Sequence, residues 1–233
     1  MSYDQTREHE QLRFLDVAIA EFILRYQSNP ATEGRRTAIL LPGGMGCTLL
    51  RARTPYDDCG GPGQTFQYDT IWLDAFTFLG NALNIAMQKQ PDGSFRDLDN
   101  RIVIANGSVA FLDCTPYDGF TVWCEQHGID WFIYGWDWRR RIEEAADFFV
   151  SQFLPRLQGA VLDAGLPDPL ADFTVLGHSF GGMVVNLVNR RADPSWTGCS
   201  RRSRSARRST ATAGRSTAGS RVTRCSTTSA SWP

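Results

Sequence analysis

The stretch that most constrains the fold covers residues 173–185 and reads FTVLGHSFGGMVV. A short apolar run leads into residues 177–181, GHSFG, which match the pattern G-x-S-x-G, and a second apolar run follows. In such a turn, small residues two positions either side of the serine let the backbone pass sharply from a strand into a helix. We therefore expect a strand, a strained turn and a helix, with the hydroxyl of Ser179 held above the sheet.

Ser179 is on this basis a candidate nucleophile. The helix is expected to begin beneath the serine, where the N–H of Phe180 can stabilise an oxyanion that develops during attack on a carbonyl carbon. A purely structural turn is the competing interpretation, because G-x-S-x-G also occurs by chance. The apolar strand before the motif and the run GMVVNLV after it favour the nucleophile.

Composition is that of an ordinary globular protein, with 233 residues, 42% hydrophobic and 21% charged residues, and a net charge of −1. The near-neutral total gives no reason to expect a specific nucleic-acid partner. The N-terminus is too polar and acidic for a signal peptide, and charges interrupt the apolar run after it, so no membrane span is expected. The expected location is the cytoplasm.

The six cysteines show no C-x-x-C spacing, which argues against a zinc or redox site. Neither a metal nor a cofactor is therefore expected. A disulfide between Cys47 and Cys59 is expected only if the protein is exported.

The first half of the chain predicts a helix, a strand and a glycine-rich loop. Apolar residues recur at helical spacing from Leu12 to Tyr26, which predicts an amphipathic surface helix that ends before Asn29. Residues 37–41, TAILL, are typical of a parallel strand covered on both faces. The loop 42–46, PGGMG, is not followed by the Lys-Ser/Thr pair of a phosphate-binding loop, so presenting an N–H to an oxyanion is its better use.

Residues 51–120 are predicted to form a lid-like insertion with little repeated order. Within it, residues 70–79 are apolar and aromatic and are expected to be helical, either as plain core or as a lid that meets a lipid chain. The remaining predictions here are a turn at Asp92-Gly93, a strand at 101–105, and a helix at 120–126 that ends at Gly128.

The second half of the chain predicts further strands and helices in alternation. Residues 129–134 read as a buried strand, and residues 142–162 as a helical stretch with a kink or break at Pro155. The strand of the serine turn follows. Strand, helix, strand, helix is the pattern of a doubly wound parallel sheet.

The serine turn, the glycine-rich loop and the strand order together resemble an α/β-hydrolase. Three stretches resemble the lecithin:cholesterol acyltransferase family: residues 42–46 its oxyanion loop, residues 71–74 (IWLD) its lid segment, and residues 134–139 (YGWDWR) its Tyr-Asp-Trp-Arg stretch with two inserted residues. The likeness covers about Thr37 to Asn189. It implies an incomplete α/β-hydrolase fold in residues 1–198, with a mostly parallel sheet, flanking helices and the lid-like insertion.

The resemblance implies a serine ester hydrolase or O-acyltransferase that acts on lipid-like acyl esters through an acyl-serine intermediate. Ser179 matches the nucleophile, while Phe180 and Gly44 match the two oxyanion positions, the second of which carries Asp or Asn in the family. Trp72 matches the lid tryptophan that borders the acyl site. Peripheral contact with lipid surfaces is expected from such substrates. Asp137 and Arg139 are expected to form a structural ion pair.

A catalytic base is not found where this fold requires one. The triad order is Ser, then Asp or Glu, then His, yet no histidine follows Ser179 and Asp193 is the only acid after it. His178 is expected to point away from its neighbour, His127 should lie at the opposite end of the sheet, and His9 is near a terminus that is easily disordered. We therefore expect impaired activity.

Residues 199–233 form an Arg/Ser/Thr-rich tail that is expected to be disordered, because it has no hydrophobic period. It is interpreted either as a shifted reading frame in a GC-rich gene or as an Arg-rich tail that binds RNA or acidic surfaces. Translation of the other two frames downstream of codon 198 tests the first interpretation: apolar strands followed by an Asp and then a His should appear. The abrupt change in mid-fold favours that interpretation.

The strand before the serine turn is expected to have an unpaired edge. Without further strands, residues 173–176 would expose an apolar edge, so the chain as written is expected to be poorly soluble. A monodisperse monomer with a sharp melt would contradict this.

The alternative functions are a catalytically inactive binding protein with an Arg-rich tail, and a peptidase or thioesterase on the same fold.

Overall fold

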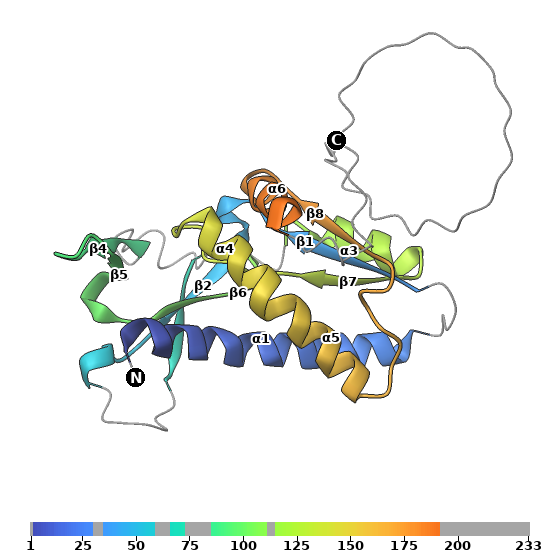
Figure 1. The fold of residues 1–233 in the computed structure, drawn as a ribbon, viewed down its shortest axis with the longest axis horizontal. Helices are drawn as coiled ribbons and strands as arrows, with labels where there is room; N and C mark the ends of the chain where they lie inside the picture. The colour runs from blue at the N-terminus through green and yellow to red at the C-terminus, as the bar shows by residue number, and fades with distance from the viewer. Residues whose placement is uncertain (1, 30–34, 59–65, 73–84, 111–114, 192–233) are drawn as a thin grey trace, which may run out of the picture.

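A computed structural model describes residues 2–29, 35–58, 66–72, 85–110 and 115–191 (Figure 1). The predicted tail at 199–233 and the acid Asp193 lie outside these ranges, as do residues 73–79 of the predicted lid segment. Within the described ranges the chain combines helices with two three-stranded sheets and a hairpin. None of the described helices has the length and apolar character that crossing a membrane requires.

One sheet is parallel and contains the three strands that the apolar runs predicted. These are β1 (Arg36–Leu41), β7 (Ile129–Ile133) and β8 (Phe173–Gly177), in the order β7-β1-β8. The central strand β1 places Ile39 opposite Phe132 on one side and Val175 on the other. Five consecutive residues of β1 are buried, which explains why its sequence is apolar without alternation.

Helices cover both faces of this sheet. The helices α1 (Tyr3–Ser28), α4 (Ile142–Phe148), α5 (Leu154–Asp163) and α6 (Phe180–Arg191) pack on the face that contains Ile39 and Leu41. Figure 1 shows α4 and α5 crossing this face between α1 and α6. Helix α3 (Asp118–Gln126) packs on the other face, against Ala38 and Leu40. The predicted helix at 120–126 is therefore confirmed, and Gly128 follows it with φ of 62°.

The helical stretch predicted for residues 142–162 is also confirmed, and its break has a clear cause. A π-helical turn, Phe149–Phe153, joins α4 to α5, and Pro155 lies in the first turn of α5. Proline lacks an N–H and its ring disturbs the preceding turn, so a wider turn before it keeps the helix continuous. The turn buries Phe149 and Phe153 completely against the parallel sheet.

The second sheet is antiparallel and gives residues 51–120 more regular structure than predicted. Its strands are β2 (Cys47–Ala52), β3 (Tyr68–Trp72) and β6 (Val103–Ser108), in the order β3-β2-β6. Little repeated order was expected here, and residues 70–72 were expected to be helical, yet they lie in β3. The strand predicted at 101–105 begins two residues later. The expectation of a mostly parallel sheet with flanking helices therefore holds in part for the described strands, since one of the two larger sheets is parallel and the other is antiparallel.

A hairpin adds the last two described strands, β4 (Met87–Lys89) and β5 (Phe95–Asp97). They pair antiparallel around the predicted Asp92-Gly93 turn, which is confirmed. Gly93 has φ of 84°, a conformation that suits glycine because it has no Cβ.

Helix α1 joins the two sheets. It begins at Tyr3, earlier than predicted, because Ser2 and Gln5 form a capping box at its N-terminus. Tyr3 and Phe14 pack with the antiparallel sheet, while the buried C-terminal half of the helix packs on the parallel sheet. The side-chain amide of Gln11 both donates to the carbonyl of Ala105 and accepts from its N–H, each at 2.9 Å, and so satisfies part of the edge of β6.

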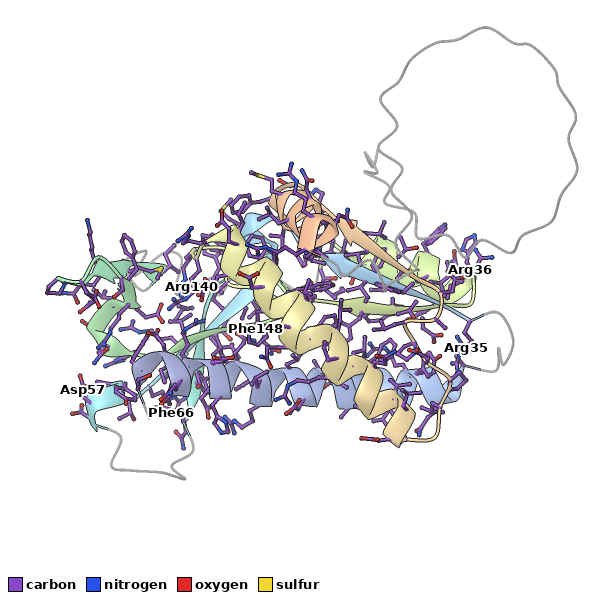
Figure 2. All side chains as sticks on the ribbon, in the orientation of Figure 1. Arg35, Arg36, Asp57, Phe66, Arg140 and Phe148 are labelled. Atoms are coloured by element: carbon purple, nitrogen blue, oxygen red, sulfur yellow. The ribbon has the colours of Figure 1, made fainter. Side chains whose placement is uncertain are left out.

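A buried charge network fixes the segment after β7 to the antiparallel sheet and the hairpin. Arg139 contacts Asp137 at 2.6 Å and Asp97 at 2.7 Å, and Arg140 contacts the same two carboxylates. Tyr3 donates its hydroxyl proton to Asp97 at 2.6 Å. The predicted ion pair between Asp137 and Arg139 is thus confirmed, and it is part of a larger cluster. Figure 2 shows Arg140 and Arg35 toward opposite ends of the fold.

Candidate functional site

The predicted strand, turn and helix around Ser179 are present. Strand β8 ends at Gly177, α6 begins at Phe180, and Ser179 between them has φ of 51°. A non-glycine residue in this left-handed region costs roughly 1–3 kcal/mol, so surrounding contacts must hold it there. The N–H of His178 donates to the carbonyl of Leu41 at 3.1 Å, which extends the pairing of β8 with β1 up to the turn. Ser179 itself is exposed.

Two glycines of the motif are required by close backbone contacts. A Cβ on Gly177 would lie 2.5 Å from Cα of Gly182, and one on Gly181 would lie within 3.0 Å of the carbonyl oxygens of Leu41 and Pro42. The helix start therefore rests directly on the end of β1. Gly182 differs, because a Cβ there would meet only ordinary contacts at 3.5 Å. The spacing of the motif is thus a packing requirement of this turn.

The glycine-rich loop lies against the same turn. It forms a single 3₁₀ turn, Gly44–Gly46, in which the N–H of Gly46 donates to the carbonyl of Gly43 at 2.8 Å. A Cβ on Gly43 would lie 3.3 Å from Cβ of Ser179, and one on Gly44 would lie 3.1 Å from Cδ1 of Phe180. The loop and the serine turn are therefore in contact. A side chain at position 44 would press against the ring of Phe180, which would have to move slightly.

The N-terminus of α6 lies where the two segments meet. The first N–H groups of an α-helix have no partner within the helix, and Phe180 is the first residue of α6. The next two N–H groups, of Gly181 and Gly182, donate to the carbonyls of His178 and Ser179 at 2.9 and 3.0 Å. This end of α6 carries the positive end of the helix dipole, which favours a developing negative charge.

Trp72 lies beside the glycine-rich loop. Its indole N–H donates to the carbonyl of Met45 at 2.9 Å, and its ring meets that of Trp138 edge to face with centroids 5.4 Å apart. A third tryptophan, Trp136, contacts the loop by donating its indole N–H to the carbonyl of Pro42 at 3.0 Å. The ring of Trp136 lies 5.3 Å from that of Phe180. The structure thus brings all four predicted site residues to one place.

Sequence reasoning missed Tyr117, which contacts both segments. The N–H of Gly43 donates to the Tyr117 hydroxyl at 2.8 Å, and that oxygen lies 3.2 Å from Nδ1 of His178. Burial raises the pKa of Tyr117 above its usual value, although the bond from Gly43 acts in the opposite direction. Tyr117 precedes α3 in a segment without a motif. Its burial, which obliges the hydroxyl to find a hydrogen-bond partner, became visible only in the structure.

The histidines occupy three separate environments. His178 directs Nδ1 toward Tyr117, His127 stacks on Trp123 just before β7, and His9 lies on an exposed part of α1. His127 is therefore at the end of the parallel sheet opposite to Ser179, as expected. The expectation that His9 lies in an easily disordered terminus is wrong, because it lies within a capped helix.

The described cysteines, the acidic side chains and a cavity beside α1 do not add to this site. Cys47 and Cys124 are free and buried, and burial raises the pKa of both thiols to about 12. Cys59, the other cysteine of the disulfide expected for an exported protein, lies outside the described residues. The described part of the chain holds no cluster of three or more His, Cys, Asp or Glu side chains suited to a metal ion. A cavity of about 600 Å³ lies between α1, α4 and the end of α6, and none of the four predicted site residues lines it.

Comparisons with known proteins do not identify a family for this chain. Neither the models of protein families nor the curated proteins contain a match to the chain.

Proposed function

We propose that the chain is a serine hydrolase or O-acyltransferase of α/β-hydrolase type, similar to the lecithin:cholesterol acyltransferase family, with Ser179 as nucleophile. The observation that carries the proposal is the left-handed Ser179 at an exposed strand-to-helix turn, in contact with a glycine-rich loop. A structural turn alone does not call for a second loop against the serine. A nucleophile does, because its reaction needs N–H donors from two segments.

The reaction follows from these positions. Oγ of Ser179 attacks the carbonyl carbon of an ester, and the N–H groups of Gly44 and Phe180 stabilise the oxyanion that forms. Collapse of this intermediate breaks the bond to the alcohol, which leaves with a proton, and an acyl-serine remains. Water or a second alcohol then takes the acyl group and restores the hydroxyl. Trp72 and the exposed Met45 beside it favour an apolar acyl chain.

Turnover is expected to be slow. A base must reach within hydrogen-bond distance of the serine, directly or through one water. Of the three histidines in the described residues, His9 and His127 lie on other elements and His178 is engaged with Tyr117. The oxyanion donors and binding alone leave a rate roughly 10³–10⁴ above that in water.

A serine-directed fluorophosphonate tests the proposal. We expect covalent labelling of the wild-type chain at Ser179, located by peptide mass spectrometry, and none at this position in Ser179→Ala. A binding protein without enzymatic activity would leave Ser179 of the folded wild type unlabelled, and the proposal would then be wrong. For a labelled protein, a chain-length series of esters beside a thioester and a peptide separates esterase, thioesterase and peptidase.

A further inference from the structure

We propose that Tyr117 is a positioning residue that holds the oxyanion loop against the serine turn. The inference rests on the proposed function and adds to it a residue that no motif marks. Tyr117 lies outside both segments of the site, just before α3, yet its hydroxyl touches both. The loop and the turn are therefore joined through one oxygen atom.

Chemistry fixes the direction of the hydrogen bond from Gly43, and the direction of the bond to His178 is part of the proposal. The N–H of Gly43 can only donate, so the hydroxyl oxygen accepts from it at 2.8 Å. The hydroxyl proton is then free to be donated to Nδ1 of His178, 3.2 Å away. This direction requires the proton of the imidazole to be on Nε2. The result is a chain of two hydrogen bonds from the loop, through Tyr117, to the residue before the nucleophile.

The position of the Tyr117 hydroxyl is closely defined by its surroundings. Tyr117 is 7% exposed and packs with Ala38, Leu40 and Phe120 beneath the sheet. A Cβ on Gly46 would lie 2.5 Å from the hydroxyl oxygen, so the loop fits around that atom. This contact gives a reason for glycine at position 46.

Positioning of this kind matters because an oxyanion donor works only at the right distance. The N–H of Gly44 follows Gly43 directly, so a shift of Gly43 moves the donor relative to Ser179. Donors must lie about 2.7–3.1 Å from the oxyanion, and a displacement of about 1 Å can cost on the order of 100-fold in rate. Tyr117 thus acts on the reaction through Gly43 and His178 and does not touch the substrate.

The test uses Tyr117→Phe, which keeps the packed ring and removes the hydroxyl. Tyr26→Phe is the matched control, because Tyr26 is also buried and its hydroxyl donates one hydrogen bond, to the carbonyl of Pro167 at 3.1 Å, at the other end of the fold. Arg35, which stacks on the Tyr26 ring, marks this end in Figure 2. We expect Tyr117→Phe to slow fluorophosphonate labelling of Ser179 by about tenfold or more, and Tyr26→Phe to leave the labelling rate unchanged.

A spectroscopic measurement separates positioning from general stability. In the wild type, the ¹⁵N spectrum of His178 should show Nδ1 as a hydrogen-bond acceptor and Nε2 as the protonated nitrogen. Tyr117→Phe should abolish this tautomer preference and speed hydrogen exchange at the Gly43 amide. Tyr26→Phe should change neither signal, although it loses a hydrogen bond of the same kind.

Gly46→Ala supplies a second variant that leaves the hydroxyl in the protein but displaces it. It should also slow labelling, and its effect should be smaller in the Tyr117→Phe background, where the clashing oxygen is gone. If Tyr117→Phe does not fold, Gly46→Ala carries the comparison with the wild type. If the wild type is labelled and the variants are labelled at the same rate, the role of Tyr117 is overturned and the proposed function still stands. Unlabelled wild type would overturn the proposed function, and this inference with it.

Discussion

The parallel sheet β7-β1-β8 and the antiparallel sheet β3-β2-β6 share helix α1, but they are joined to their neighbours by different interactions. Around the parallel sheet, backbone approaches backbone so closely that Gly177 and Gly181 admit no Cβ. Around the antiparallel sheet, buried charges make the connection, with Asp97 only 1% exposed and Arg139 at 5%. The close backbone contacts need glycines, which have no Cβ. The contacts between buried charges need both partners of each ion pair.

The candidate site lies where the two sheets meet, so it depends on both kinds of contact. The loop 42–46 runs from β1 into β2, Ser179 follows β8, and Trp72 comes from β3. Damage to the steric contacts should alter the serine turn itself. Damage to the charge network should act on the side of the site that Trp72 and Trp138 form, because Arg139 follows Trp138 directly.

The largest effect is expected from Arg139→Met, which leaves two buried carboxylates without their main partner. Breaking a buried ion pair by removing one member costs about 3–5 kcal/mol of unfolding free energy. The control is Arg53→Met in the same half of the molecule, where Arg53 and Asp69 pair at 2.7 Å but are 57% and 56% exposed. That change should cost less than about 1 kcal/mol. Urea denaturation measures both, and equal losses would contradict the comparison.

A somewhat smaller loss is expected from Gly181→Ala. The new Cβ would meet the carbonyl oxygens of Leu41 and Pro42, which belong to the backbone and cannot rotate away, so α6 must shift. Overpacking of this kind costs about 1–3 kcal/mol, and we expect the upper end of this range together with loss of Ser179 labelling. Gly182→Ala, one residue later, meets no such obstacle and should stabilise the helix by up to about 1 kcal/mol. Thermal melts of both variants check this, and equal melting temperatures would show that the tight contact is not real.

The smallest effect is expected from acid. Burial alone raises the pKa of Asp137, but the charges of Arg139 and Arg140 and the hydrogen bonds from Arg139 outweigh it and hold the pKa below its usual value. The folded state therefore binds fewer protons than the unfolded chain, whose aspartate titrates near pH ~3.9. This contribution to stability is complete above that pH and is lost as the pH falls through the lower pKa of the folded state. Urea unfolding between neutral and acidic pH should show it, and Asp137→Asn should flatten the dependence. Parallel curves for the two proteins would exclude Asp137 as its source.

Much of the parallel half could be predicted because its signals are local. The apolar run of β1, the helical spacing in α1 and the glycines around Ser179 each lie within one short segment, and the structure agrees with them. The antiparallel half was misread at β3, where the local signal is weak. Ile71 is the one buried residue of that five-residue strand, so it has no apolar run like that of β1. Its pairing with β2, such as Thr70 with Leu50, shows that the segment is a strand.

The sequence by itself determined the turn at Ser179, the glycine-rich loop and the alternation of strands and helices that carries them, because backbone sterics and hydrophobic period act between near neighbours. Only the tertiary structure decided that Tyr117 joins the loop to the turn, that the ring of Phe180 packs against Gly44, and that Asp97 receives Arg139 from 42 positions away. Those contacts depend on which distant surfaces meet, and that is settled by how the whole chain buries its apolar and charged groups together.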